Sequence, residues 1–473
     1  MGAMTGASRE AFDRGVARAL EDPVIQEVTR SGQDYMQALQ EQAHRELDWP
    51  AWLDAVEAVR SHTIANLDHY VAQFADNAER LGGQVYCAAD AAEAREHVAA
   101  LVKRKGARLV VKSKSMVTEE IALNHALEEI GAEVVETDLG ELIVQLAGER
   151  PFHIVAPAAH KSLAQIRDLF STLAGEELAA DAGVLTTFAR HVLREKFLAA
   201  DVGISGCNFG VAATGTIVLV TNEGNGRMTT TLPQTHIVVM GVERLVPDLQ
   251  SLEPILAVLP WAGAGERITA YVTAINGPRR PGDGDGPEEL HVVLVDNGRS
   301  SILGSKYEKI LHCIRCGACL DVCPVYRKIG GHAYDSTYPG PIGAVLSPLL
   351  DGLERHPELP FASSLCGACS EVCSARIPLA DYLLELRADA VEAGADGASW
   401  TAGFRGFAEA TRRPRLWALG ERVARVALRP FERRGRVRSG PGPLGLWTRS
   451  RDLPPLARRS FRELWQRRRP PGS

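Results

Sequence analysis

The sequence has no apolar run near the roughly 20 residues that a helix needs to cross a bilayer. Its best candidate, Pro254 to Gly265, is short and is interrupted by Pro260. The N-terminus also lacks a basic segment followed by an apolar one, and Glu10 and Asp13 come early, which argues against a secretory signal. We therefore expect a cytoplasmic protein.

Two kinds of functional motif are missing as well. No G-x-G-x-x-G segment opens a helix after a strand, so nothing indicates hydride transfer with a bound dinucleotide. Nothing resembles a zinc finger, an RNP sequence or a homeodomain, so we expect no nucleic-acid partner. The composition itself is ordinary, with 45% apolar and 24% charged positions in 473 residues. It excludes a collagenous or wholly disordered protein, and the length predicts about two to four domains.

Charge is divided unevenly along the chain, although the formal net charge is only -6. Residues Thr401 to Ser473 contain 19 Arg, no Lys and 5 acidic residues, which gives +14 and leaves -20 on the rest. Such a basic tail is typical of a surface that docks on an acidic partner or on the protein's own acidic body. Peripheral membrane contact is the alternative, because an apolar stripe runs along a basic helix at Leu416, Leu419, Val423 and Val426.

The pattern of apolar residues predicts four regions. Residues 1–75 have helical spacing and form an N-terminal helical extension, whereas 76–300 alternate apolar runs with helical segments such as Thr118 to Glu129. Runs rich in Val, Ile and Leu indicate strands buried on both faces of a mainly parallel sheet, so this region is an α/β domain. Residues 301–395 form a helical, cysteine-bearing domain, and 396–473 a basic helical C-terminal region. The expected strands are 108–112, 133–136, 153–156, 215–220, 236–240, 268–272 and 291–295.

Seven of the nine cysteines lie between Cys313 and Cys373. The first four, Cys313, Cys316, Cys319 and Cys323, have the spacing C-x2-C-x2-C-x3-C-P, which is the bacterial ferredoxin run. Clustering of this kind in a large, cytosolic chain indicates metal rather than disulfides. We predict iron–sulfur clusters, with tetrahedral zinc as the alternative.

A second run, Cys366, Cys369 and Cys373, repeats the last two gaps of the first run, and Ser363 stands where its first cysteine would be. In two-cluster ferredoxins the fourth cysteine of each run binds the other cluster. This rule gives Cys313, Cys316, Cys319 and Cys373 to cluster 1, and Cys323, Cys366 and Cys369 to cluster 2. Cluster 2 is then a [4Fe-4S] cluster with a non-cysteine fourth ligand, a [3Fe-4S] cluster, or absent. We favour the first, although Ser363 reads more simply as an ordinary turn serine.

Polar residues collect where strands of the α/β domain are expected to end. Ligands of open parallel sheets bind at the carboxyl ends of the strands. We therefore predict a pocket for a small anion, or for a group of a partner, at this edge. Solvated lysines and glycine turns are the simpler interpretation of the same residues. The candidate pocket residues are Lys112, Lys114, Asn222, Glu223 and Arg227.

A resemblance to a known family is carried by the first cysteine run and by five further segments, 112–116, 203–209, 215–227, 338–345 and 364–369. These segments resemble the lactate utilisation protein B family. The resemblance implies an α/β domain of the lactate-utilisation (LUD) type, similar in fold to sugar-phosphate isomerases and formyltetrahydrofolate cyclo-ligases. It also implies the iron–sulfur subunit of a complex that oxidises L-lactate to pyruvate, with two [4Fe-4S] clusters on the seven cysteines. The implied partners are a cysteine-rich redox subunit and a second protein with a LUD-type domain.

Two other functions fit the same residues. The α/β domain could itself be catalytic on a small anionic substrate, with the clusters as accessories. Alternatively, the chain could be a scaffold in which the clusters are structural. Reduction of the clusters by lactate, with and without partner proteins, separates these hypotheses from electron transfer.

Overall fold

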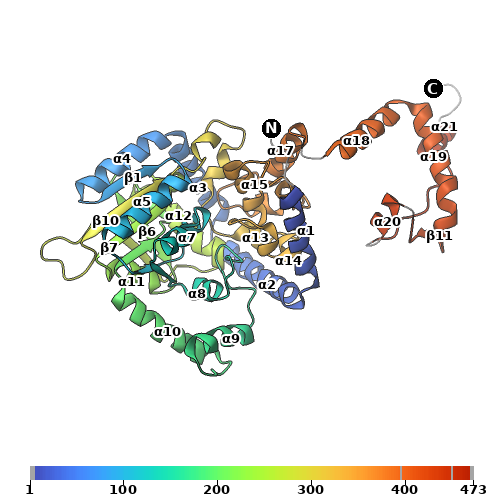
Figure 1. The fold of residues 1–473 in the computed structure, drawn as a ribbon. Helices are drawn as coiled ribbons and strands as arrows, with labels where there is room; N and C mark the ends of the chain where they lie inside the picture. Colours follow the sequence, from blue (N-terminus) through green and yellow to red (C-terminus); the bar gives the residue numbers. More distant parts are fainter. Residues whose placement is uncertain (1–5, 395–396, 441, 449–450, 469–473) are drawn as a thin grey trace. The chain divides into compact units, whose positions relative to one another are not determined.

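The computed structural model describes residues 6–394, 397–440, 442–448 and 451–468. The chain divides into two compact units, with the boundary at Ala390 (Figure 1). The first unit holds the N-terminal helices, the α/β layers and all the cysteines. The second unit holds the basic region.

A six-stranded parallel sheet forms the centre of the α/β part. Its strand order is β1(Gln84–Ala88), β10(Glu289–Val295), β7(Thr235–Gly241), β4(Val202–Ser205), β2(Leu109–Lys112) and β3(Glu133–Glu136). The apolar runs form these strands because both faces of the sheet are covered, which suits β-branched residues. The expected parallel sheet is confirmed, and β1 and β4 are strands that the sequence pattern did not reveal.

Helices cover both faces of this sheet. Val110 belongs to a core shared with α5(Ala91–Arg104) and α7(Leu123–Glu129), whereas Val111 packs with α8(Leu139–Leu146), α9(Leu163–Ala174) and α10(Ala182–Ala199). Successive strand residues point to opposite faces, so these two cores lie on opposite sides of the sheet. The helix expected from Thr118 to Glu129 is broken into α6(Met116–Glu120) and α7, because Ala122 between them has a left-handed backbone with φ 50°.

A second, four-stranded sheet has the order β8(Leu245–Val246), β5(Phe209–Val211), β6(Thr216–Thr221) and β9(Tyr271–Ile275). It contains the strands expected near 215–220 and 268–272, and β6 pairs antiparallel with both neighbours. The strand expected at 153–156 is wrong, since this segment is a loop. The His153 ring nitrogen Nδ1 accepts hydrogen bonds from the backbone N–H groups of Val155 and Ala156, which turns the chain away from an extended course.

The N-terminal helices pack on the cysteine region. Helices α1(Gly6–Glu21) and α2(Pro23–Glu46) contact α14(Tyr326–Ile329), and α2 also contacts α13(Ala318–Asp321) and α12(Leu249–Ala264). One hydrophobic core joins these helices to α3(Trp49–Ala65), α15(Gly340–Asp351) and α17(Leu379–Glu392). The helical prediction for the N-terminal region is confirmed over its described part. The helices also form one wall of the cysteine region.

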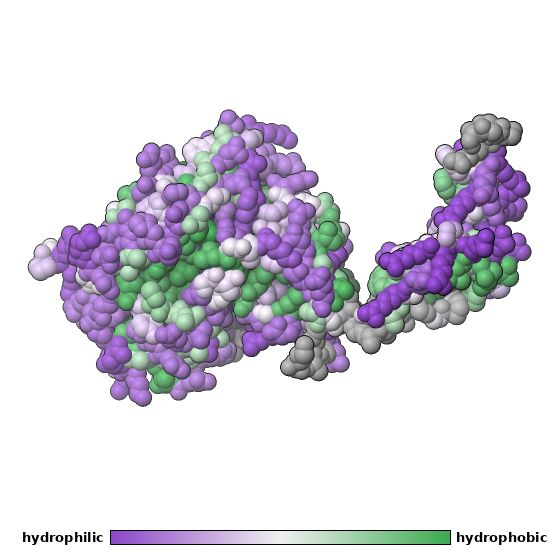
Figure 2. Space-filling view, turned by 90° about the horizontal axis from the view of Figure 1, so that it is seen from above, coloured by the Kyte–Doolittle hydropathy of each residue, from purple (hydrophilic) through white to green (hydrophobic). Residues whose placement is uncertain are grey.

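The second unit is built from helices α18(Gly397–Arg412), α19(Pro414–Leu428), α20(Pro443–Thr448) and α21(Phe461–Arg468), with a short hairpin of β11(Glu432–Arg433) and β12(Arg436–Val437). Figure 2 shows hydrophobic side chains beside strongly hydrophilic ones on this unit. The apolar stripe of α19 is solvent-exposed, with Val426 68% exposed. Among the described residues, no helix is long and apolar enough to cross a membrane.

A buried histidine makes the sheet sensitive to acid. His236 lies in β7, is fully buried, and its Nε2 is 2.8 Å from Ser205 Oγ in β4. Burial lowers the pKa of His236 to about 3. The folded protein therefore keeps the ring neutral, while the unfolded chain takes up a proton below its usual pKa of about 6.5. Stability is lost as the pH falls from about 6.5 toward 3.

We predict that this single group removes about 2 kcal/mol of folding free energy between pH 7 and pH 5. His236→Gln should flatten the dependence of the melting temperature on pH in this window. Circular dichroism melts at both pH values measure the effect, with the exposed His125→Gln as control. An unchanged pH slope in His236→Gln would contradict the prediction.

Candidate metal centre

The first cysteine run wraps around a tight turn. Cys313 follows the short helix η3(Glu308–His312), Cys319 lies within α13, and Cys323 follows α13. Gly317 has φ 84°, a conformation that favours glycine, and a Cβ there would lie 3.0 Å from the Val155 side chain. The turn and the close packing together explain the glycine between the second and third cysteines.

The second run repeats this local structure. Gly367 has φ 88° and precedes the four-residue helix α16(Ala368–Glu371), which holds Cys369 and packs against α13. The cysteine that follows each helix accepts a backbone hydrogen bond on its sulfur. Tyr326 N donates to Cys323 Sγ at 3.4 Å, and Ile377 N donates to Cys373 Sγ at 3.3 Å. Two equivalent loops thus face one another.

Electrostatic interactions link thiols of one cysteine run to thiols of the other run. Burial, together with the nearby Cys316 and Cys313 thiols of the other run, raises the pKa of Cys373 to about 12. Burial likewise raises the pKa of Cys369 to about 11, with Cys323 of the first run and Cys366 adding to the effect. The last cysteine of each run therefore neighbours the other run's thiols.

This donor set fits an iron–sulfur cluster. Buried thiols with raised pKa values stay protonated unless a metal ion binds them as thiolates. Among the described residues around the first cysteine loop, four guanidinium groups lie in a network with two carboxylates, Glu120 and Glu243, and three of the four interact electrostatically with Cys313, so positive charge is in excess there. A cluster held by four thiolates is anionic and offsets that excess. The four guanidinium groups belong to Arg60, Arg244, Arg299 and Arg315.

Three glutamines of α2 tie the cysteine loops to the N-terminal helices. The side-chain amide of Gln33 donates to the Leu320 and Cys323 carbonyls at 2.7 and 3.1 Å. Gln37 donates to the Asp321 carbonyl at 2.6 Å, and Gln40 donates to the Ala262 carbonyl at 2.8 Å. Gln33 and Gln37 thus satisfy carbonyls at the end of α13, whereas Gln40 bonds to α12 and, at 3.1 Å, to the Asp321 carboxylate. None of the three was expected from the sequence. Their spacing of four and three residues on one helix face was the available signal.

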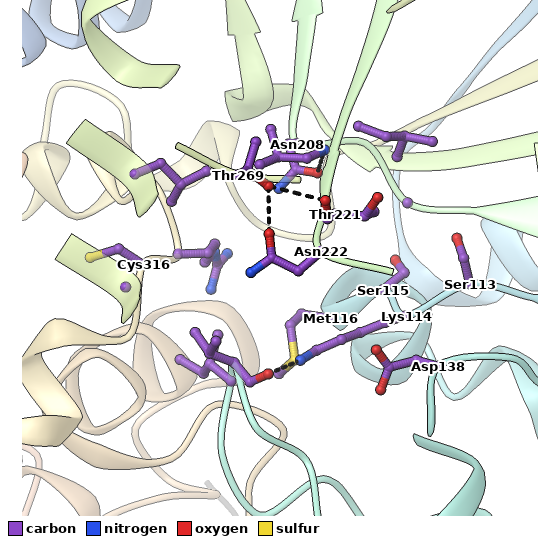
Figure 3. A pocket seen from close by; sticks show the side chains of 18 of the residues that line it. Ser113, Lys114, Ser115, Met116, Asp138, Asn208, Thr221, Asn222, Thr269 and Cys316 are labelled. Carbon is purple, nitrogen blue, oxygen red and sulfur yellow. Dashed lines mark hydrogen bonds between the residues drawn. The ribbon is translucent and has the colours of Figure 1, made fainter. Parts of the chain in front are cut away.

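A cavity of about 360 Å³ lies between the α/β layers and the first cysteine loop (Figure 3). It is lined by the segments that follow β2 and β4, by the end of β6, and by Arg244, Arg315 and Cys316. In Figure 3, Cys316 lies on one side of the cavity and Asp138 on the opposite side. The cavity therefore joins the carboxyl ends of the sheet strands to a cysteine of the candidate metal centre.

Three of the five predicted pocket residues meet in the wall of this cavity: Lys114, Asn222 and Glu223. Lys114 Nζ donates to the Val155 carbonyl at 2.6 Å. Lys112 is not among the lining residues. It is fully buried, and its Nζ lies 2.7 Å from carboxylate oxygens of Glu119 and Glu136.

Arg227 is also outside the lining set, and its guanidinium lies 5.5 Å from the centre of the Tyr271 ring. Arg244 and Arg315 also line the cavity and were not expected from the sequence: Arg244 follows β7 through the short helix η1(Val242–Arg244), and Arg315 belongs to the first cysteine run. Burial lowers the pKa of Lys114 and raises that of Glu223. The cavity wall thus combines basic, acidic and amide groups with apolar surface.

Three family models match consecutive parts of the chain: LUD domain over residues 71–295, 4Fe-4S dicluster domain over 309–377, and Lactate utilisation protein B, C-terminal, over 392–470. Lactate utilization protein B of Shouchella clausii is 48% identical over 464 residues, covering 98% of each chain. The protein of the same name from Bacillus licheniformis is 48% identical and covers 97% of each chain.

A solved structure of a duf162 family protein from Deinococcus radiodurans covers 48% of this chain and 98% of its own, with 16% identity and a TM-score of 0.27. The near-complete coverage by the relatives above, together with the three consecutive family models, identifies the family. This chain belongs to the lactate utilization protein B family.

Proposed function

We propose that this chain is the iron–sulfur electron-transfer subunit of a complex that oxidises L-lactate to pyruvate. The observation that carries the proposal is the pairing of two cysteine loops through α13 and α16, in which each loop's last thiol neighbours the other loop. Two clusters with exchanged ligands lie close together, which gives electrons a short path. The relatives are named for lactate utilization, which supports lactate as the proposed substrate of the complex.

In this proposal Cys313, Cys316, Cys319 and Cys373 hold cluster 1, and Cys323, Cys366 and Cys369 hold cluster 2. The protein's residues bind the clusters and supply hydrogen bonds to sulfur. Three thiolates and a non-cysteine ligand complete a second [4Fe-4S] cluster. The loss of one iron would convert it to the [3Fe-4S] form.

Exchange of the ligands has a direct test. Cys373→Ala should alter the cluster bound by the first run, whereas Cys366→Ala should alter the other cluster. Electron paramagnetic resonance of the reduced, anaerobically purified proteins distinguishes the two signals. Uncrossed ligation predicts instead that both substitutions change the same signal. Iron and sulfide analysis of each variant shows how much of the second cluster is retained.

The exposure of the thiols suggests how electrons pass through the subunit. Cys316 borders the cavity, whereas Cys366 is solvent-exposed. We infer that electrons enter near Cys316 and leave near Cys366 toward a cytoplasmic partner. The partners are a cysteine-rich redox subunit and a second LUD-domain protein, and the basic second unit provides a docking surface for acidic groups.

Lactate should reduce the clusters only when the partner subunits are present. The chain alone carries no dinucleotide motif for hydride transfer, so lactate added to it should leave the cluster absorbance unchanged. Anaerobic absorption spectra of the chain with lactate, with and without partners, measure this. Turnover by the isolated chain would instead favour a catalytic α/β domain. Clusters that stay silent at all accessible potentials would favour a structural role.

The cavity beside Cys316 is the proposed site for a small anion or a partner's group. Its volume is at the lower end of the ~300–1,000 Å³ typical of ligand sites, and it lies at the strand ends where ligands of parallel sheets bind. Arg315 adds an unpaired donor, since its buried Nη1 has no hydrogen-bond partner among the described residues. Lys114, Asn222 and Glu223 provide polar contacts at the other side.

Filling the cavity should slow the entry of electrons. Val220 lines the cavity, and Val220→Phe should lower the rate of lactate-dependent cluster reduction in the complex about tenfold at low lactate. Val272→Phe is the matched control, because Val272 pairs with Val220 in register on β9 but is half exposed and outside the cavity. Equal rates in the two variants, at equal iron content, would reject the site.

A further inference from the structure

The second set of thiols is one ligand short of a complete [4Fe-4S] site. Among the described residues, the hydroxyls of Ser364 and Tyr334 lie beside Cys366 and Cys323, and Ser363 holds the position that matches Cys313 of the first run. Each has a different relation to the three cysteines. These differences distinguish the hydroxyl that can bind iron from the hydroxyls that donate hydrogen bonds to cysteine sulfur.

The backbone around Ser363 repeats the backbone around the first cysteine of the first run. Between Cys313 and Gly317, Arg315 has φ 62° and Gly317 has φ 84°. The matching positions of the second run are Leu365 with φ 55° and Gly367 with φ 88°. A left-handed backbone is unfavourable for arginine and for leucine. Its presence at both positions indicates a shared loop geometry.

The side chain at the first position of each run accepts the same kind of hydrogen bond. Arg315 N donates to Cys313 Sγ at 3.4 Å, and Leu365 N donates to Ser363 Oγ at 3.0 Å. The shorter distance reflects the smaller oxygen atom. On this shared backbone, Ser363 Oγ takes the place in its loop that Cys313 Sγ takes in the first loop.

The position of Ser363 is also held from outside the loop. Arg387 in α17 donates through Nη2 to the Ser363 carbonyl and through Nε to the Pro360 carbonyl, both at 2.8 Å. These two bonds fix the chain just before the strained Leu365. The loop is thus built to present the first position, although a serine occupies it.

The other two hydroxyls, those of Ser364 and Tyr334, are placed to donate hydrogen bonds to cysteine sulfur. The Ser364 hydroxyl bonds to the Cys366 thiol, and Ser364 itself is exposed. The buried Tyr334 hydroxyl has the Cys323 thiol as its polar neighbour and no nitrogen or oxygen partner among the described residues. A group within hydrogen-bond distance of one ligand's sulfur lies too close to that sulfur to bind a different iron. Both hydroxyls suit a hydrogen bond to a bound thiolate.

We propose that Ser363 Oγ is the fourth ligand of the second [4Fe-4S] cluster. The inference rests on the proposed two-cluster function and adds the missing ligand. When the Fe–O bond forms, the hydroxyl proton leaves to water and no electron is transferred. An oxygen ligand suits an iron–sulfur centre less well than a thiolate, so this corner is the labile one. Loss of its iron yields a [3Fe-4S] cluster.

Four variants of the full chain, purified without oxygen, test the assignment. Ser363→Ala should lose about one iron per chain relative to the wild type and give the resonance of a [3Fe-4S] cluster. Ser363→Cys restores the spacing of the first run, so it should keep the full iron content and lose iron more slowly in air than the wild type. Ser364→Ala and Tyr334→Phe should keep the wild-type iron content.

Wild-type iron content without a [3Fe-4S] signal in Ser363→Ala would overturn the proposal. Loss of one iron in Ser364→Ala or Tyr334→Phe would assign the ligand elsewhere and overturn it as well. If Ser363→Ala fails to fold, the comparison of Ser363→Cys with the wild type decides. Equal rates of iron loss in air from these two proteins would overturn the proposal. A wild-type protein with iron and sulfide for one cluster refutes the two-cluster function itself, which is a separate outcome.

Discussion

A buried network of ion pairs holds the first cysteine loop against the α/β layers. Arg299 lies 2.8 Å from Glu120 and 2.6 Å from Glu243, and Arg315 lies 3.3 Å from Glu243. Arg315 stands between two cysteines, so this network fixes the loop as well as the layers. Burying such charges costs hydration free energy, which is recovered only when each charge keeps its partners. The position of Cys316 at the cavity therefore depends on carboxylates from two distant segments of the α/β domain.

Much of the fold could be predicted because it depends on the burial of apolar runs, which are visible in short stretches of the sequence. The apolar runs at β2, β3, β6, β7 and β10 follow directly from burial of both sheet faces. The loop at His153 could not be predicted, since its apolar residues read as a strand. The side chain of His153 takes up backbone donors that a strand would use for its neighbours. The strand β4 was hidden because Gly203 and Ser205 interrupt its apolar residues, whereas β2 and β3, of equal length, each contain a Val-Val pair.

The candidate metal centre also has a part that the sequence predicts and a part that only folding assembles. The gaps of three and four residues predict the cysteine loops, because ligand spacing is a property of the local chain. The surrounding charges come from positions 60, 244, 299 and 315, and only folding brings them together. Lys112 was wrongly predicted to line the pocket. Its place at a strand end suggested a ligand contact, yet two carboxylates on neighbouring elements already neutralise it.

The two thiol sets differ in environment, and the difference bears on the proposed transfer of electrons. Positive charge stabilises the additional electron of a reduced cluster, and the buried guanidinium groups lie beside the first set. The second set has the exposed Cys366, and the acidic Glu371 lies near that thiol. Under the proposed function, the electron is therefore held more tightly at the cluster beside the cavity and its guanidinium groups. Transfer outward then proceeds as the acceptor removes electrons at the exposed edge, so the partner at Cys366 controls the direction of flow.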